Sequence, residues 1–295
     1  MKKVLVIIVT YNGMKWLGRC LSSVRESSLK ADIFVVDNGS TDGSVEYIRS
    51  NFPEARLQVA ERNLGFGAAN NMGLRYAIDK GYEFVYLLNQ DAWLEDETLR
   101  LLVDASESNP DYGILSPLQV NGTSSALDTN FSRFYPESLP QFPSVVPMPE
   151  GVCEVRFAMA AHWLMTRRCL LTVGLFSPTF FHYGEDSNYV DRLHYHRLKI
   201  GIVPRAIAIH DREFRQHTIA TRQREFGSYG LIYLSNPNSR LRYPRWLYHI
   251  AQTLLRSPQA ISLTTILDTV KSLGDISRNR RESKNMGAFI KTRVL

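Results

Sequence analysis

The chain opens on Val4-Leu5-Val6-Ile7-Ile8-Val9, a continuous apolar run in which most side chains are β-branched. Such a run is typical of a strand buried on both faces of a parallel sheet. Helically spaced apolar residues follow at 16–24, and the alternation continues to residue 108. It predicts further strands at 33–36, 57–60 and 84–88, and further helices at 44–52, 68–80 and 96–108. This order indicates an α/β fold with a doubly wound, mostly parallel sheet and right-handed crossovers.

The pattern is less regular after residue 120. Residues 121–151 contain five prolines and little periodicity, which predicts a long irregular connection that serves as a functional loop. Beyond it we predict strands at 155–165 and 206–209 and helices at 167–173 and 186–199. After His210 the sequence becomes helical and basic.

Composition separates a body from a tail. The 295 residues are 44% hydrophobic with a net charge of +6, which is ordinary for a folded protein. Residues 215–295 hold 14 bases and four acids, whereas residues 1–214 carry a net charge of −4. We therefore expect chemistry in residues 1–214 and electrostatic docking in residues 215–295.

Two further sequence features bear on location. The three cysteines are widely spaced and lack a CxxC pattern, so we expect a reducing compartment with no disulfide or zinc site. The opening apolar run is too short for a signal-peptide core or a membrane-spanning helix. We expect a cytoplasmic protein.

Polar or glycine-rich residues follow each predicted strand of the first half. Ligands bind beyond the carboxyl ends of such strands, so these positions are the first candidates for a site. They are Thr10-Tyr11-Asn12-Gly13, Asp37-Asn38-Gly39-Ser40-Thr41-Asp42, Asn63-Leu64-Gly65-Phe66-Gly67 and Asn89-Gln90-Asp91.

Each candidate also has a purely local explanation. Asp37 and Asp91 can bind a metal and a nucleotide, but Asp37 also suits a turn. The Gly65-Phe66-Gly67 loop suits either an anion or a tight helix start. Glu185 can act as a general base or simply complement the dipole at a helix start. His210 can be a metal ligand or a structural residue.

Six motifs in order carry a resemblance to a known family. They are Val9-Thr10-Tyr11-Asn12, residues 35–44 (VVDNGSTDGS), residues 63–71 (NLGFGAANN), Leu87-Leu88-Asn89-Gln90-Asp91, residues 180–186 (FFHYGED) and residues 203–210 (VPRAIAIH). Together they resemble family-two inverting glycosyltransferases of the GT-A fold, particularly rhamnosyltransferase-like members, across about the first 210 residues. The resemblance implies a Rossmann-like sheet in which residues 1–120 bind the nucleotide and residues 121–214, with the proline-rich loop, bind the acceptor.

The resemblance implies a role for each matching residue. The nucleotide-sugar donor would be bound by Thr10, Tyr11, Asn12, Asp37, Asn63, Gly65, Gly67, Asn71, Asn89 and Gln90. Mg²⁺ or Mn²⁺ would be bound by Asp91, with His210 completing the site. Asp186 would be the general base, with Glu185 as the fallback. Asn89 departs from the family pattern because it replaces the first acid of the usual DXD motif, and Ala161-His162-Trp163 replaces a small, Gly-rich stretch.

The implied partners follow from this chemistry. The donor would be a UDP- or dTDP-sugar, with dTDP-rhamnose favoured, and the acceptor a glycan or a polyprenyl-diphosphate-linked glycan. The competing interpretations are a sugar-nucleotide nucleotidyltransferase and a noncatalytic protein that binds nucleotide sugars.

The basic tail contains two amphipathic stretches. The first apolar face comprises Trp246, Leu247, Ile250, Ala251, Leu254 and Leu255, and the second Leu263, Ile266, Leu267 and Val270. These faces either pack on the catalytic domain or contact an anionic membrane, which would make the protein peripheral on the inner face of the cell membrane. Nucleic acid is not expected as a partner, because no recognition module accompanies the bases.

Overall fold

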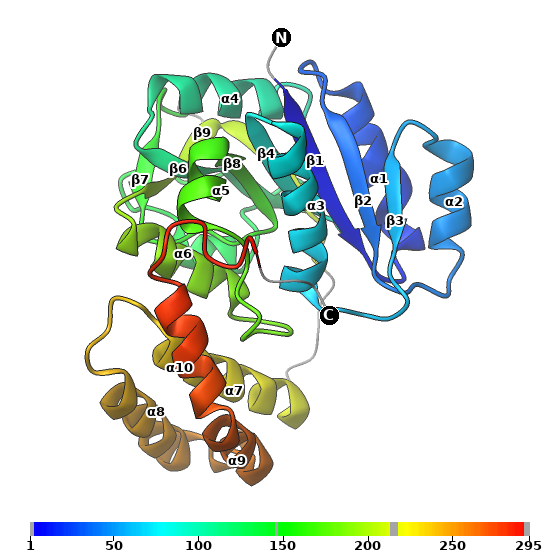
Figure 1. The fold of residues 1–295 in the computed structure, drawn as a ribbon. Helices are drawn as coiled ribbons and strands as arrows, with labels where there is room; N and C mark the ends of the chain where they lie inside the picture. The colour runs from blue at the N-terminus through cyan, green and yellow to red at the C-terminus, as the bar shows by residue number, and fades with distance from the viewer. Residues whose placement is uncertain (1–2, 145–146, 213–217, 292–295) are drawn as a thin grey trace. The chain divides into compact units, whose positions relative to one another are not determined.

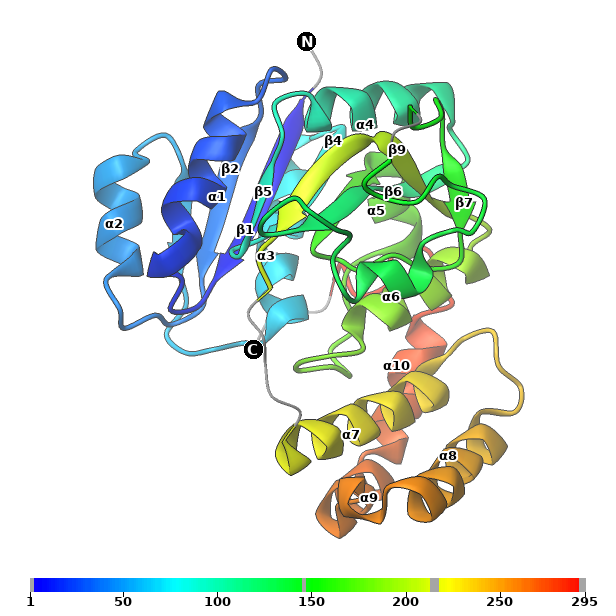
Figure 2. The ribbon, with the colours of Figure 1, turned by 180° about the vertical axis from the view of Figure 1, so that it is seen from behind.

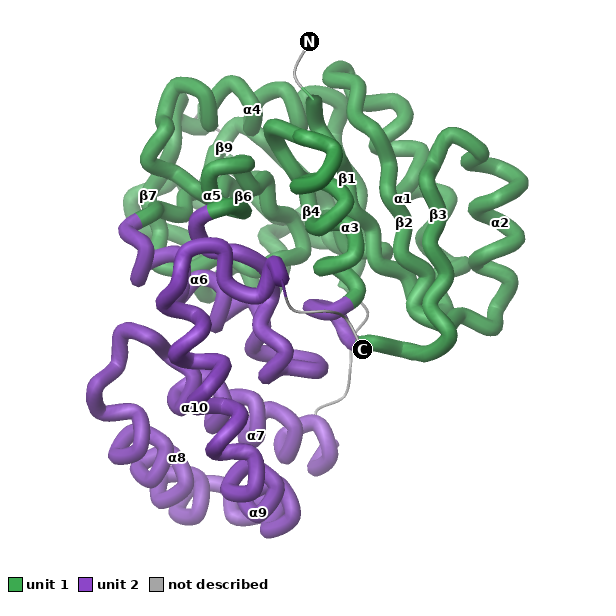
Figure 3. Tube along the Cα trace, in the orientation of Figure 1, with its two compact units in different colours: residues 1–64, 69–171, 198–212 green, residues 65–68, 172–197, 213–295 purple. Residues whose placement is uncertain are grey.

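The computed structural model describes residues 3–144, 147–212 and 218–291. The chain forms two compact units, which Figure 3 distinguishes by colour. Unit 1 comprises residues 1–64, 69–171 and 198–212, and unit 2 comprises residues 65–68, 172–197 and 213–295. The predicted boundary between residues 214 and 215 lies outside the described residues and stays a prediction.

Unit 1 contains the predicted parallel sheet (Figure 1). Its first strands are β1 (Val4–Thr10), β2 (Asp32–Asp37), β3 (Arg56–Val59) and β4 (Phe84–Asn89), arranged β3-β2-β1-β4 and all parallel. The connecting helices are α1 (Met14–Glu26), α2 (Ser44–Asn51) and α3 (Phe66–Lys80). The α/β prediction for this half is confirmed.

The continuous apolar run of β1 is buried on both faces, as predicted. Val6 and Ile8 pack in one core cluster with Leu17 and Leu21 of α1. On the other face, a Cβ added to Gly73 of α3 would lie within 2.9 Å of three Ile7 side-chain carbons. Close packing of α3 on β1 therefore requires glycine at this position, and Figures 1 and 2 show α3 and α1 on opposite faces of the sheet.

The sheet continues past β4 with five more strands, of which the sequence predicted parts of β7, β8 and β9 but not β5 or β6. These are β5 (Ala92–Leu94), β6 (Tyr112–Asn121), β7 (Cys153–Val155), β8 (His162–Thr166) and β9 (Lys199–His210). The full order is β3-β2-β1-β4-β8-β6-β9-β5, and β7 pairs with β9. Strands β6 and β9 are parallel, whereas β8 runs antiparallel to both β4 and β6. The helix α4 (Thr98–Ser108) precedes β6.

Three predicted elements had wrong boundaries. The strand predicted at 155–165 is two strands, because β7 ends at Val155 and β8 begins at His162. The helix predicted at 186–199 ends at Tyr195, since Arg197 turns the chain with a φ of +60°. Strand β9 then begins at Lys199 rather than at residue 206. Internal prolines concealed β6 and the first half of β9, because proline normally argues against a strand.

Unit 2 is mainly helical. Its helices are α6 (Glu185–Tyr195), α7 (Ile219–Ser235), α8 (Arg242–Arg256), α9 (Leu263–Lys271) and α10 (Leu273–Glu282), while α5 (Arg167–Val173) begins in unit 1. Leu234, Trp246 and Ile276 form a small core between α7, α8 and α10. The helical character predicted for the basic tail is confirmed. No helix among the described residues is long and apolar enough to cross a membrane.

Candidate active site

Hydrogen bonds tie the loop after β4 to the end of β1. The Gln90 Oε1 atom accepts hydrogen bonds from the Thr10 hydroxyl and the Tyr11 backbone N–H, both at 2.8 Å. The Gln90 Nε2 atom donates to the Tyr11 carbonyl at 3.3 Å. Thr10 is fully buried and its hydroxyl is occupied, whereas 46% of Tyr11 is exposed. Thr10 and Gln90 thus build the floor of the site, and the Tyr11 ring lies open at its surface.

Asparagine side chains tie the neighbouring loops together. Asn12, which adopts a φ of +50°, accepts from the Thr41 N–H at 2.9 Å and donates its own N–H to Ser40 Oγ at 2.9 Å. Asn38 Nδ2 donates to Asn63 Oδ1 at 3.0 Å. The loops after β3, β2, β1 and β4 therefore form one hydrogen-bonded layer at the carboxyl edge of the sheet, as strand order predicts.

Only one carboxylate oxygen of Asp37 takes part in the turn that follows β2. Its Oδ1 atom accepts from the Gly39 N–H at 3.2 Å and the Ser40 N–H at 3.0 Å, which is the turn role expected from the sequence. The side chain is fully buried, and its Oδ2 atom has no hydrogen-bond partner among the described residues. A buried carboxylate oxygen without a partner is costly, so Oδ2 has an unused capacity to accept a hydrogen bond, and its role in donor binding stays a prediction.

Asp91 and His210 come together although they are far apart in the sequence of unit 1. Asp91 follows β4 and His210 ends β9, and Asp91 Oδ1 lies 3.4 Å from His210 Nε2. Burial alone raises the pKa of Asp91, but the hydrogen bond from His210 and the charge of Arg212 lower it more. The net pKa of Asp91 is below its ordinary value, so this carboxylate is ionised at neutral pH.

The other ring nitrogen of His210 faces a residue that the sequence analysis missed. His210 Nδ1 lies 3.6 Å from Asp128 Oδ2 and 3.4 Å from Arg212 Nη2. Asp128 is buried, accepts the N–H groups of Asn130 and Phe131, and pairs with Arg212 at 3.1 Å. Asp128 lies in the irregular segment predicted at 121–151. The only local sign of its importance is the turn that it forms with Asn130 and Phe131.

The Asp91–His210 pair fits a divalent cation that a substrate also holds. Among the described residues, no group of three or more His, Cys, Asp or Glu side chains is arranged to hold a metal ion alone. Mg²⁺ and similar ions are commonly bound by one or two protein ligands together with substrate phosphates. Asp91 Oδ1 and His210 Nε2 lie 3.4 Å apart, a separation that suits two adjacent ligands of one such ion. Asp128 lies on the other side of the His210 ring, where it can orient the imidazole.

His162 holds three strands together beneath this pair. It is fully buried on β8, with Nε2 3.1 Å from the Ile209 carbonyl and Nδ1 2.8 Å from the Tyr86 hydroxyl. Since a carbonyl only accepts, Nε2 carries the proton and Nδ1 accepts from Tyr86. Burial lowers the pKa of His162 to about 3 and keeps the ring neutral. His162, which departs from the family pattern, therefore has a structural role in unit 1.

Close packing within unit 2 explains why both ends of the Gly65-Phe66-Gly67 loop are glycines. Gly65 has a φ of +81°, and any Cβ there would collide with the Phe181 carbonyl oxygen. A Cβ on Gly67 would approach Phe176 Cβ to 3.1 Å. The anion-binding role of both glycines stays a prediction, as does that of Asn71, which is buried on α3 in unit 1.

Glu185 and Asp186 begin α6 but differ in environment. Only 7% of Glu185 is exposed, and its Oε2 atom has no hydrogen-bond partner among the residues described. Burial and the neighbouring charge of Asp186 raise the pKa of Glu185 to about 8. Asp186 is half-buried, and its Oδ1 atom accepts from the Ser187 N–H at 2.7 Å. Glu185 is therefore more than a solvated acid at a helix start.

A buried arginine fixes α6 in unit 2. Arg192 is fully buried and donates to the carbonyls of Val173 at 3.0 Å and Leu175 at 2.7 Å. Its guanidinium carbon also lies 4.8 Å from the centre of the Tyr189 ring. The sequence showed only a base on a helix, yet Arg192 holds the helix that presents Glu185 and Asp186.

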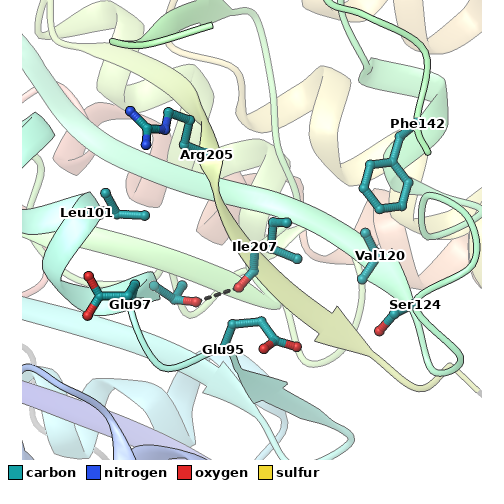
Figure 4. Close-up of a pocket in the computed structure, with 9 residues that line it drawn as sticks. Glu95, Glu97, Leu101, Val120, Ser124, Phe142, Arg205 and Ile207 are labelled. Carbon is teal, nitrogen blue, oxygen red and sulfur yellow. Dashed lines mark hydrogen bonds between the residues drawn. The ribbon is translucent and has the colours of Figure 1, made fainter. Parts of the chain in front are cut away.

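A separate hollow of about 390 Å³ opens between α4, β6 and β9 of unit 1 (Figure 4). Glu95, Glu97 and Arg205 are among its lining residues, and Thr98 donates to the Ile207 carbonyl across it. None of the predicted site residues lines it. This hollow is therefore not the predicted donor site.

Known proteins resemble this chain in sequence. One relative is the N-acetylglucosaminyl-diphospho-decaprenol L-rhamnosyltransferase of Mycobacterium tuberculosis, 31% identical over 122 residues, which are 38% of this chain and 40% of that protein. Another is the low-salt glycan biosynthesis hexosyltransferase Agl10 of Haloferax volcanii, 25% identical over 219 residues, which are 72% of this chain and 68% of that protein. The match to the mycobacterial protein thus spans less than half of its length.

Solved structures show the same fold. S. aureus TarS 1–349 in complex with UDP-GlcNAc has a TM-score of 0.60 at 16% identity, with 98% of this chain and 85% of that chain covered. The mannosyltransferase PcManGT of Pyrobaculum calidifontis, in complex with GDP-Man and Mn²⁺, has a TM-score of 0.56 at 17% identity, with 98% and 84% covered. These similarities confirm the GT-A fold. The sequence model for glycosyl transferase family 2 matches residues 5–170, more than half of the chain, so the chain belongs to glycosyl transferase family 2.

Proposed function

We propose that the protein is an inverting glycosyltransferase that moves a sugar from a UDP- or dTDP-sugar to a glycan or a polyprenyl-diphosphate-linked acceptor in cell-surface polysaccharide synthesis. The observation that carries the proposal is the free Oδ2 atom of Asp37, buried at the carboxyl edge of the sheet. A family-2 chain with an acceptor oxygen held there fits a donor nucleotide, whose base and ribose offer N–H and O–H groups.

The donor would bind across the hydrogen-bonded loops. Asp37 Oδ2 would accept from the nucleoside, while the exposed Tyr11 ring offers a surface on which a pyrimidine can stack. Asn12 and Gln90 hold this surface rigid through their backbone contacts. The TarS structure contains UDP-GlcNAc, and the mycobacterial relative is a rhamnosyltransferase, so UDP-GlcNAc and dTDP-rhamnose are the first donors to test.

Asp91 and His210 would hold Mg²⁺ or Mn²⁺ against the donor diphosphate. An imidazole together with a carboxylate favours Mn²⁺, because Mg²⁺ prefers oxygen ligands. The PcManGT structure contains Mn²⁺, which is consistent with this preference. When bound, the cation would stabilise the negative charge of the departing nucleoside diphosphate.

Asp186 would act as the general base. It would accept the proton of the acceptor hydroxyl as that oxygen bonds to the anomeric carbon and the bond to the nucleoside diphosphate breaks. One displacement inverts the anomeric configuration, and no covalent intermediate with the enzyme is needed. Glu185 is the weaker candidate, because a carboxyl with a pKa of about 8 is mostly protonated at neutral pH.

A polyprenyl-linked acceptor would place the protein peripherally at the inner face of the cell membrane. The mycobacterial relative is named for a decaprenol-linked acceptor, which supports this part of the proposal.

A thermal-shift series with nucleotide sugars, each with and without Mn²⁺, tests the proposal directly. We expect a UDP- or dTDP-sugar to raise the melting temperature by mass action, and more so with Mn²⁺. Donor-dependent release of nucleoside diphosphate should follow. Binding without release with any acceptor would indicate a noncatalytic binding protein, whereas pyrophosphate release from a nucleoside triphosphate and a sugar phosphate would indicate a nucleotidyltransferase.

A further inference from the structure

The helices α8 and α9 carry two apolar faces rather than one. The inner face of α8 packs Trp246 and Ile250 against α7 and α10, and Ile266 of α9 packs on the same cluster. The remaining apolar residues of the predicted faces point outward. They are strongly exposed, with fractions of 59% for Leu247, 54% for Leu254, 86% for Leu255, 70% for Leu263, 48% for Leu267 and 47% for Val270. Packing within unit 2 therefore explains only three of the ten residues in the two predicted faces.

The exposed residues form a continuous stripe on each helix. At about 100° per residue, Tyr243, Leu247, Ala251 and Leu254 of α8 follow one line, and Tyr248 and Leu255 lie beside it. Leu263, Leu267 and Val270 do the same on α9. Figures 1 and 2 show both helices at the end of unit 2 away from α6. We call these nine residues the outer face.

Arginines flank the outer face and no acid lies among them. Arg245 and Arg256 follow Tyr248 and Leu255 around α8, and both are exposed. The sequence between Glu225 and Asp268 contains four arginines and no Asp or Glu. Asp268, the first acid after this stretch, lies 3.8 Å from Lys271. The surroundings of the outer face are therefore strongly positive.

We propose that the outer face docks unit 2 on an anionic phospholipid bilayer, with the leucines in the acyl boundary and Arg245 and Arg256 at the phosphates. The proposal rests on the proposed function, since a lipid-linked acceptor requires access to a membrane. Tyrosines such as Tyr243 and Tyr248 suit the headgroup depth, where one end of the ring is apolar and the other is wet. A second copy of the chain would fit the outer face less well, because its own Arg245 and Arg256 would lie against those of the first copy and repel them.

Flotation of the full chain with vesicles tests the proposal. We expect binding to vesicles that contain phosphatidylglycerol and much weaker binding to phosphatidylcholine alone. The double variant Leu247→Glu/Leu255→Glu should lower the partition coefficient at least about tenfold, because it places charge in the acyl boundary. Arg245→Gln/Arg256→Gln should weaken binding to the anionic vesicles and flatten its salt dependence.

Met286→Glu is the matched control, since Met286 is 73% exposed in unit 2 but lies outside α8 and α9. It should bind vesicles like the wild type. Equal binding by Leu247→Glu/Leu255→Glu, or no vesicle binding by the wild type, would overturn the proposal. So would sedimentation that shows a dimer lost in the same double variant. UDP binding measured on every variant keeps the tests separate: docking without donor binding would refute the proposed function and leave the docking surface intact.

Discussion

His210 Nδ1 lies 3.6 Å from Oδ2 of Asp128, a carboxylate buried in the irregular segment after β6. The opposite nitrogen of the same ring faces Asp91 at 3.4 Å. If His210 binds a cation through Nε2, its proton must sit on Nδ1, and Asp128 is there to accept it. A carboxylate behind a ligating histidine is a recurrent way to fix the imidazole and raise its basicity.

Asp128→Asn should therefore weaken Mn²⁺ binding by about 10- to 100-fold in the presence of UDP. Asparagine keeps an oxygen that can accept the N–H groups of Asn130 and Phe131, so the fold should survive. Isothermal titration with Mn²⁺ gives the affinity, and the melting temperature reports on folding.

Arg212→Gln is the control for this prediction. It removes the ion pair with Asp128 but leaves the carboxylate beside His210. An equal loss of Mn²⁺ affinity in both variants would mean that Asp128 acts through Arg212 instead. No Mn²⁺ binding by the wild type would remove Asp91 and His210 from any metal role.

Asp37→Asn tests the donor site. The variant retains an oxygen for the turn, but an NH₂ group replaces the acceptor oxygen offered to the nucleoside. Loss of a hydrogen bond to a charged group is worth about 1.5–3 kcal/mol, so UDP or dTDP affinity should fall by roughly 10- to 100-fold. Calorimetric titration with the nucleotide measures this change.

Asp32→Asn is a matched control at the opposite end of β2. Asp32 is exposed and accepts a hydrogen bond from the Tyr82 hydroxyl at 2.7 Å. The Asp32→Asn variant should leave the affinity for UDP or dTDP unchanged. Unaltered affinity in Asp37→Asn as well would show that Oδ2 does not meet the donor.

The parallel half of the fold was predictable because its strands are uninterrupted apolar runs with helices between them. The second half was only partly predictable: the helix at 167–173 was predicted correctly, whereas β6 and the first half of β9 were not predicted. Strand β6 contains Pro117 and the buried Gln119, and β9 contains Pro204, so neither has a clean strand pattern. Both are held by pairing with each other along nine residue pairs, a long-range interaction that local patterns do not reveal.

The candidate site shows the same division. The positions of Asp37 and Asp91 at the carboxyl edge of the sheet were predictable, because Asp37 ends β2 and Asp91 follows β4. Asp128 was not, since it reaches His210 across 82 positions of sequence from a segment without periodicity. Arg192 was also missed, because a charged residue on a helix usually faces water and this one is fully buried.

Asp186→Asn should lower kcat by about 10²- to 10⁴-fold while the affinity for the donor stays near that of the wild type. The reason is that the proposed base touches the acceptor hydroxyl and not the nucleotide. Glu185→Gln should cost less activity, because Glu185 is largely protonated at neutral pH. Steady-state kinetics and nucleotide titration separate the two effects. A parallel loss of donor affinity in Asp186→Asn would indicate a structural role.

Glu185 should also make the stability of the protein depend on pH. Its pKa of about 8 in the folded chain exceeds the ordinary value near 4.5, so between these values the folded state keeps a proton that the unfolded state has lost. Stability should therefore fall as pH rises from about 4.5 to 8, by up to about 1.4 kcal/mol per pH unit. Glutamine cannot ionise, so Glu185→Gln should flatten this decline and be more stable than the wild type at pH 8. Urea unfolding at several pH values measures the slopes. Glu46→Gln, an exposed acid in the first turn of α2, should keep the wild-type slope; parallel curves for Glu185→Gln and the wild type would show that Glu185 does not carry this proton.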